Sequence, residues 1–182
     1  MHWHASLCSG AALLIESVAS SCSVLSVIFN IFESKNVRNF LLLYGIAYVV
    51  GTLAEAVGLK WGLFFGSYYY TLKSSGVFNV PLQVSLFWGN LYYLSHLFAN
   101  RLSKKHLYFY DAAIMVGIDL LLDPVMVRLG AWKWKDGGVY FGVPFANFVG
   151  WFLVTLLISV LVRKVFKIKI LDKNSFGLAS LA

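Results

Sequence analysis

The fold of this chain is decided by one stretch, which links an apolar helical run to the next through a short aromatic loop. From Asp119 to Trp151 it reads DLLLDPVMVRLGAWKWKDGGVYFGVPFANFVGW. Two carboxylates, Asp119 and Asp123, stand in a run that is otherwise hydrophobic. A loop rich in Trp, Tyr and Gly follows, and a second apolar run begins at Val143-Pro144. The stretch therefore predicts two apolar helices joined by a loop, with acidic and aromatic side chains where they meet.

The composition indicates a membrane protein. The chain has 182 residues, of which 59% are hydrophobic and 13% charged, and its mean hydropathy is +0.74, whereas soluble domains are about half apolar and a quarter charged. Several apolar runs of about 20 residues could each cross a bilayer as a helix. We expect residues 1–182 to form one integral membrane domain, an all-α, polytopic transmembrane helical bundle. The net charge of +7 comes from loops and the tail, so we do not expect nucleic-acid binding.

Five apolar runs are predicted as spans, and a short tail follows them. The spans cover about residues 5–32, 39–58, 80–100, 106–128 and 143–166, and the tail is 167–182. The third and fifth runs open with Val80-Pro81 and Val143-Pro144. Proline at the first helical turn needs no hydrogen-bond donor and presets the backbone angle, so both prolines predict helix starts.

The distribution of basic residues predicts the orientation in the cell membrane. Cytoplasmic loops collect Lys and Arg, and with five spans ten basic residues fall on one side and five on the other. We expect the N-terminus outside and the C-terminus in the cytoplasm. Glu55, Asp119, Asp123 and the loops 59–79 and 129–142 then converge on the outer side.

The two loops resemble each other. Each follows a helix that ends in carboxylates, carries Trp, Tyr and Phe-Gly, and precedes a helix that starts with Val-Pro. Trp88 and Trp151 each fall seven residues after the proline, two turns along nearly the same helix face. This pattern predicts a parallel two-helix repeat with a site at its interface.

Carboxylates inside apolar helices are the strongest functional signal. Asp119 and Asp123 are four residues apart, on one helical face, and burying a charge in lipid costs at least a few kcal/mol, so such residues usually mark function. Glu55 lies at a similar depth. Alternatively, Asp123 ends the helix before Pro124, and Glu55 reaches water at the interface. Asp111, near the inner end of its run, is interpreted as solvated.

Acidic and aromatic side chains in a medium of low dielectric suit one kind of chemistry. A buried carboxyl group can stay neutral and act as an acid, and aromatic faces stabilise a cation. This combination favours protonation of an electron-rich alkene in a lipid-soluble substrate, with water within reach at the outer side. Aromatic belts at membrane interfaces are the alternative explanation for the Trp and Tyr residues.

The two halves together resemble the carotenoid biosynthesis membrane protein family, which includes carotenoid 1,2-hydratases and bisanhydrobacterioruberin hydratase. The resemblance covers about residues 50–155. One half carries Glu55-x-x-Gly58-x-x-Trp61-Gly62, Phe65-Gly66-x-Tyr68-x-Tyr70, Val80-Pro81 and Trp88; the other carries Asp119-x-x-x-Asp123-Pro124, Trp132-x-Trp134, Tyr140-Phe141-Gly142-Val143-Pro144, Asn147 and Gly150-Trp151.

The resemblance implies addition of water across the terminal C1=C2 bond of an acyclic carotenoid, such as bisanhydrobacterioruberin, lycopene or γ-carotene. The expected catalytic residues are Asp119, Asp123 and Glu55. The residues expected to bind the polyene are Trp61, Tyr68, Tyr70, Trp88, Trp132, Trp134, Tyr140, Asn147 and Trp151. This chemistry requires no metal or organic cofactor. The expected partners are the polyene, water, the bilayer and other enzymes of carotenoid synthesis.

Two other functions fit the same residues. An isoprenoid cyclase or prenyltransferase would use related cation chemistry, although prenyl transfer needs Mg²⁺ and basic groups. A lipid or pigment carrier built on the repeat would bind the polyene without changing its mass.

Overall fold

The structure is a computed structural model, and it describes residues 17–18, 21–22, 24–32, 36–71, 76–103 and 105–170. It is mostly helical. The described residues between 17 and 32 are helical, and four longer helices follow: α2 (Val37–Trp61), α3 (Leu82–Leu102), α4 (Leu107–Leu129) and α5 (Phe145–Val160). A π-helical turn, η1 (Leu161–Val165), continues α5. Residues 5–16 of the predicted first span and the predicted tail from residue 171 lie outside the described residues.

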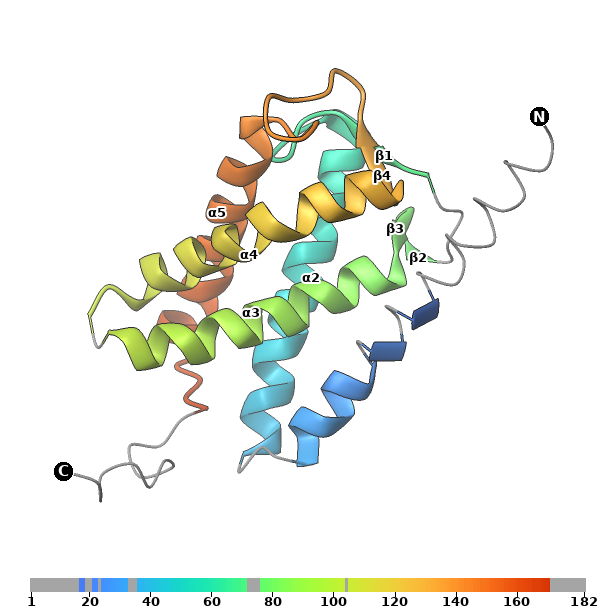
Figure 1. Ribbon diagram of the computed structural model, residues 1–182. Helices are drawn as coiled ribbons and strands as arrows, with labels where there is room; N and C mark the ends of the chain where they lie inside the picture. Colours follow the sequence, from blue (N-terminus) through green and yellow to red (C-terminus); the bar gives the residue numbers. More distant parts are fainter. Residues whose placement is uncertain are drawn as a thin grey trace, which may run out of the picture.

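The helices pack mainly against their neighbours in the chain. α2 contacts α3, α3 contacts α4 and α4 contacts α5, while further contacts between α2 and α5 close the bundle. Figure 1 shows α3 and α4 running side by side across α2 and α5. The helices begin and end within a few residues of the predicted second to fifth apolar runs.

Short strands join the two aromatic loops, a feature that the all-α prediction did not include. β1 (Tyr68–Tyr70) pairs antiparallel with β4 (Trp132–Trp134), so that Tyr68 faces Trp134 and Tyr70 faces Trp132. A second, smaller pair is formed by β2 (Gly76–Val77) and β3 (Val80–Pro81). Trp and Tyr favour extended backbone, and each aromatic loop supplies the hydrogen-bonding edge that the other needs. The predicted convergence of the two loops at one end of the molecule is therefore observed (Figure 1).

The three prolines have different effects on the helices. Pro81 and Pro144 stand one residue before α3 and α5, as N-caps. Pro124 lies inside α4, which continues to Leu129, so the alternative that Asp123 ends the helix is wrong. Because Pro124 has no N–H, it cannot donate to the carbonyl of Leu120 four residues earlier. The hydroxyl of Tyr140 donates to that oxygen instead, at 3.2 Å, and so ties the second aromatic loop to α4.

Glycine allows α2 and α3 to pack closely. A Cβ atom on Gly51 would lie 2.1 Å from Cγ of Trp88. Only a glycine can occupy this position, because the indole of Trp88 lies directly against the backbone of α2. Gly51 therefore makes room for Trp88 one turn away from Glu55 on α2.

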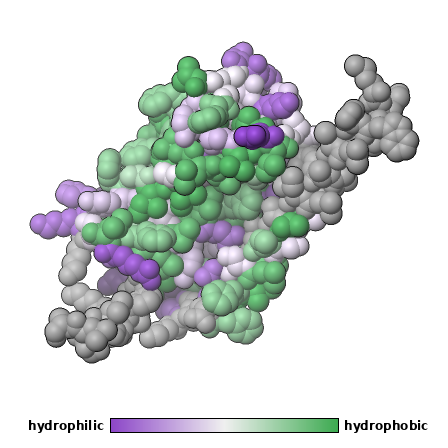
Figure 2. All heavy atoms as spheres, in the orientation of Figure 1, coloured by the Kyte–Doolittle hydropathy of each residue, from purple (hydrophilic) through white to green (hydrophobic). Residues whose placement is uncertain are grey.

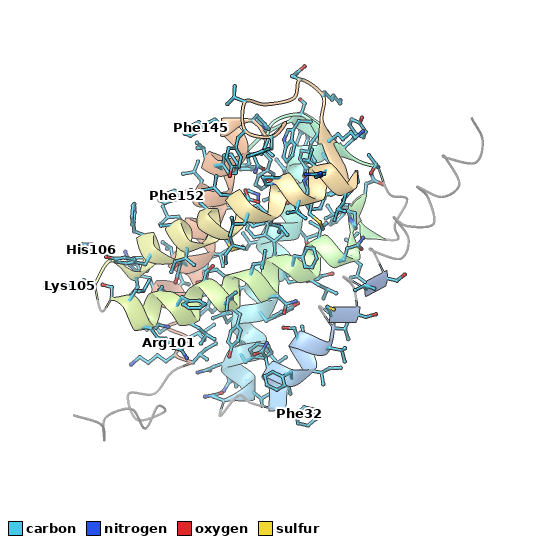
Figure 3. The ribbon with its side chains drawn as sticks, viewed as in Figure 1. Phe32, Arg101, Lys105, His106, Phe145 and Phe152 are labelled. Atoms are coloured by element: carbon cyan, nitrogen blue, oxygen red, sulfur yellow. The ribbon has the colours of Figure 1, made fainter. Side chains whose placement is uncertain are left out.

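The surface fits a membrane environment. Among the described helices, Val37–Trp61 and Phe145–Val165 are long and apolar enough to cross a bilayer. The face formed by α3 and α4 is mostly hydrophobic (Figure 2). Arg101, Lys105 and His106 lie at the α3–α4 turn, far from Phe145 at the end that holds the aromatic loops (Figure 3).

Candidate functional site

Glu55 is held by three aromatic donors, which come from α3 and β1. Its side chain is 5% exposed. Trp88 of α3 donates from Nε1 to Oε1 at 3.1 Å, and Tyr70 of β1 donates its hydroxyl to Oε2 at 2.9 Å. The hydroxyl of Tyr68 donates to the same Oε2. Glu55 is therefore buried and held in place by hydrogen bonds, which differs from the alternative of a glutamate reaching water at the interface.

The two tyrosines that bind Glu55 remain protonated donors. Burial raises the pKa of Tyr68 and of Tyr70 above the usual value, and the negative charge of Glu55 raises each pKa further. A raised pKa means that the hydroxyl keeps its proton to a higher pH than a free tyrosine does. Both hydroxyls thus continue to donate to Glu55 at and above neutral pH.

The second acidic group is the pair on α4. Asp119 and Asp123 are 0% and 2% exposed, and Nδ2 of Asn147 lies 2.8 Å from Oδ2 of Asp119 and 2.5 Å from Oδ2 of Asp123. Nε1 of Trp132 donates to the other oxygen of Asp123 at 3.1 Å. The remaining oxygen of Asp119 has no hydrogen-bond partner among the described residues. One amide of α5 therefore brings the two carboxyl groups together.

The aromatic rings near Glu55 pack closely against one another. Trp88 and Trp151, the two tryptophans at matching positions after Pro81 and Pro144, lie with ring centroids 4.3 Å apart and planes at 13°. Trp134 donates to the carbonyl of Phe65 at 2.7 Å, which fixes its ring beside Tyr68. The aromatic side chains are thus held by hydrogen bonds and stacking as well as by burial.

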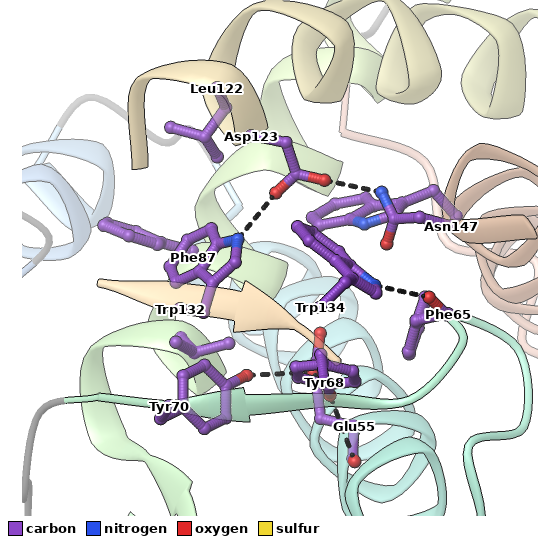
Figure 4. Close-up of a pocket in the computed structure, with 12 residues that line it drawn as sticks. Glu55, Phe65, Tyr68, Tyr70, Phe87, Leu122, Asp123, Trp132, Trp134 and Asn147 are labelled. Carbon is purple, nitrogen blue, oxygen red and sulfur yellow. Dashed lines mark hydrogen bonds between the residues drawn. The ribbon is translucent and has the colours of Figure 1, made fainter. Parts of the chain in front are cut away.

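A small cavity lies within this group. Its volume is about 30 Å³, enough for a water molecule. Figure 4 shows the arrangement of the lining residues, which are Glu55, Phe65, Tyr68, Tyr70, Val84, Phe87, Leu122, Asp123, Trp132, Trp134, Asn147 and Trp151. Carboxyl groups from α2 and α4 therefore face one aromatic cavity.

The structure places the other predicted residues at different distances from this cavity. Asp119 and Trp88 stand directly behind it, bonded to Asn147 and Glu55. Tyr140 is tied to the backbone of α4, and Trp61 is 61% exposed at the end of α2, with Lys60 over its ring. None of these four residues lines the cavity.

Four apolar lining residues were not predicted. They are Phe65, Val84, Phe87 and Leu122. Phe65 follows the helix-ending Trp-Gly motif, Phe87 precedes Trp88, and Leu122 precedes Asp123, so proximity in sequence to the predicted residues was the available signal. Apolar residues in an apolar helix otherwise carry no mark of facing a site.

The interpretation of Asp111 as a solvated residue is wrong. Its side chain is 0% exposed, and Arg163 of η1 donates to both of its oxygens at 2.7 Å. Tyr92 and Ser159 also donate to it, and His96 lies 3.7 Å away. The position of Asp111 near the inner end of its helix suggested contact with solvent. The residue that neutralises its charge, Arg163, comes 52 residues later in the sequence.

A comparison with known protein families identifies the family of this chain. The model of the family described as "Carotenoid biosynthesis protein" matches residues 12–180. The chain belongs to the carotenoid biosynthesis protein family. The match extends beyond the region of about 50–155 that carries the motifs. No curated protein and no solved structure is significantly similar to the chain. This carotenoid biosynthesis protein therefore has a role in making carotenoids, and its buried acidic and aromatic cavity is the candidate site for that role.

Proposed function

We propose that this protein is a membrane carotenoid hydratase, which adds water across the terminal C1=C2 bond of an acyclic carotenoid. One observation carries the proposal: Asp123 and Glu55 line the same water-sized aromatic cavity from different helices. Addition of water to an alkene needs an acid on one side of the double bond and a base with a water molecule on the other. The cavity offers both groups within an apolar surrounding that suits a polyene end group.

In the first step Asp123 donates a proton to C2. Asp119 and Asp123 bind the same Asn147 amide, and neither is paired with Lys or Arg among the described residues. Two carboxylates so close together repel each other when both are ionised, so one of them keeps its proton. Asp123 lines the cavity and Asp119 stands behind it, which makes Asp123 the donor and Asp119 the positioning residue that shares the proton.

In the second step water captures the cation. Protonation at C2 leaves a tertiary cation at C1, and the faces of aromatic rings attract such a charge; Trp134 and Trp151 line the cavity for this purpose. The oxygen of a water molecule bonds to C1, and its released proton goes to Glu55. Return of one proton from Glu55 to the aspartate pair restores the enzyme. The net reaction adds one water and consumes nothing else.

We further propose that the protein crosses the cell membrane several times, with the aromatic loops on the outer side. Val37–Trp61 and Phe145–Val165 supply two apolar helices of sufficient length, and basic residues gather at the α3–α4 turn at the opposite end. A carotenoid stays within the bilayer, so a site near one membrane face has the substrate on one side and water on the other.

The test is expression in cells that accumulate lycopene or bisanhydrobacterioruberin, followed by mass spectrometry of the pigments. A hydratase gives products heavier by one or two waters. Unchanged pigment alongside confirmed membrane expression would contradict the proposal. A product of unchanged mass but shorter chromophore would indicate a cyclase, and a heavier hydrocarbon that requires added Mg²⁺ would indicate prenyl transfer.

A further inference from the structure

The cavity is too small for the end of a carotenoid. Its volume is about 30 Å³, whereas an apolar cavity that admits a molecule as large as benzene has about 150 Å³. A branched five-carbon end group needs space comparable to benzene. The substrate can therefore reach Asp123 and Glu55 only if some lining side chains move outward.

The lining residues differ in how tightly they are held. Tyr70, Phe87 and Leu122 are half-buried, and the others are buried. The hydroxyl of Tyr70 is bonded to Glu55, but Phe87 and Leu122 are apolar and make no hydrogen bond through their side chains. In Figure 4 they lie on the side of the cavity away from Asn147 and Phe65. Rotation of these two side chains opens the cavity without breaking a hydrogen bond.

The surface outside Phe87 and Leu122 suits a hydrocarbon chain. Leu94 and Phe98 lie two and three turns further along the same face of α3 as Phe87, and they are 41% and 44% exposed. The segment from Leu82 to Asn100 contains no Lys, Arg, Asp or Glu. From Phe87 to Phe98 the helix rises about 16 Å, and the visible face of α3 and α4 is mostly hydrophobic (Figure 2).

We propose that a linear polyene enters the site sideways from the bilayer, between Phe87 of α3 and Leu122 of α4. Its end group occupies the cavity, and the rest of the chain lies along the apolar face of α3 that Phe87, Leu94 and Phe98 form. The identity of the occupant as a polyene substrate rests on the proposed function. The opening suits an acyclic apolar chain, because the side chains of Phe87 and Leu122 are apolar and offer no partner to a charged group.

This geometry has a consequence for polyenes with two identical ends. Only one end fits the cavity at a time, and the molecule must leave and turn round before the second end can enter. The product with one added water is therefore released before the product with two. A time course should show the singly hydrated product rising first and then falling.

The test compares tryptophan substitutions at neighbouring positions of α4. Leu122→Trp places a larger ring in the opening, while Leu121→Trp adds the same ring at a position that is 74% exposed. Purified proteins in detergent micelles are mixed with lycopene, and the bound pigment and the hydrated products are measured. We expect Leu122→Trp to lower both by at least about tenfold, because an overfilled opening excludes the chain, and Leu121→Trp to stay close to wild type.

The outcomes separate the two proposals. If the wild type binds lycopene without hydrating it and Leu122→Trp abolishes binding, the opening stands and the hydratase proposal fails. If the wild type hydrates lycopene and Leu122→Trp binds and hydrates it as well as Leu121→Trp does, the proposed entry between Phe87 and Leu122 is wrong. Phe87→Ala serves as the second variant, since it removes bulk from the opening without adding any. It should bind lycopene at least as fast as the wild type, and slower binding in a folded protein would also overturn the opening.

Discussion

The protein buries aspartates at both ends of the α4–α5 pair, and the two ends treat the charge in opposite ways. At one end Asp111 receives two hydrogen bonds from Arg163 as well as those of Tyr92 and Ser159. At the other end Asp119 and Asp123 share one neutral amide beside a cavity. Aspartate on the same helix is thus paired with a cation where it joins helices, whereas no described Lys or Arg pairs with it where we place the chemistry.

The largest expected difference between the two ends is in product formation. Asp123→Asn removes the proposed acid and should lower the yield of hydrated carotenoid by about 10²–10⁴-fold per folded molecule. Asp111→Asn should leave that yield, corrected for folded protein, within a few-fold of wild type. Asp136→Asn, at an exposed carboxylate in the second aromatic loop, is the matched control. Equal activity of Asp123→Asn and wild type would show that Asp123 contributes no more to product formation than Asp111 does.

Substitution of Asp111 should lower the free energy of unfolding more than substitution of Asp119, the reverse of the order expected for product formation. Asp111→Asn leaves the guanidinium of Arg163, which is 10% exposed, without its counter-charge, and breaking such a buried pair costs about 3–5 kcal/mol. Asp119→Asn breaks no ion pair among the described residues and leaves a neutral polar group of the same size beside Asn147, so the free energy of unfolding should change little. Thermal unfolding of both variants in the same detergent measures the difference. A larger loss for Asp119→Asn than for Asp111→Asn would contradict the comparison.

Removing both partners of the Asp111–Arg163 ion pair tests whether the two charges stabilise the fold only as a pair. The double variant Asp111→Leu/Arg163→Met replaces two charges by apolar groups, and such replacements are often neutral in buried sites. We expect it to recover most of the stability lost in Asp111→Asn. The single variants Asp111→Leu and Arg163→Met complete the double-mutant cycle that isolates the coupling energy between the two residues. A double variant as unstable as the sum of the single variants would show that the pair is not coupled.

The smallest expected effect concerns two tryptophans of β4. Trp132→Phe removes the donor to Asp123, and Trp134→Phe removes the donor to the carbonyl of Phe65. Each lost hydrogen bond is worth about 1 kcal/mol. At Trp132 this should lower the rate of hydration about fivefold, whereas at Trp134 it should lower stability with little change in rate. Rates at saturating substrate and unfolding temperatures for both variants provide the measurement.

Much of the fold follows from the sequence because hydrophobic runs and prolines act locally. The runs at 80–100 and 106–128 correspond to α3 and α4 with shifts of one or two residues. The matching of the two aromatic loops correctly predicted that they meet. Their pairing as strands was not predicted, because a three-residue strand such as Tyr68–Tyr70 has no periodicity of its own and takes its conformation from β4. The wider repeat stays a prediction.

The candidate site was partly predictable for the same reason. A carboxylate in an apolar helix stands out at Glu55, Asp119 and Asp123, but the pattern does not say which partner each one has. Asp111 carried the same signal, and its pairing depends on a π-helical turn that directs Arg163 inward. Phe87 and Leu122 could not be distinguished from residues that face lipid, since both positions call for apolar side chains.

The pairing of β1 with β4 also sets when the site can exist during synthesis of the chain. A ribosome that has made the protein as far as Leu129 has already produced Glu55, Asp119 and Asp123. The chain at that point still lacks Trp132, which donates to Asp123, and Asn147, which joins the two aspartates. The three acidic groups are therefore made before the side chains that hold Asp119 and Asp123. Synthesis of α5 therefore completes the site that α2 and α4 begin, and a translation intermediate stalled before it should be the form most exposed to quality-control proteases.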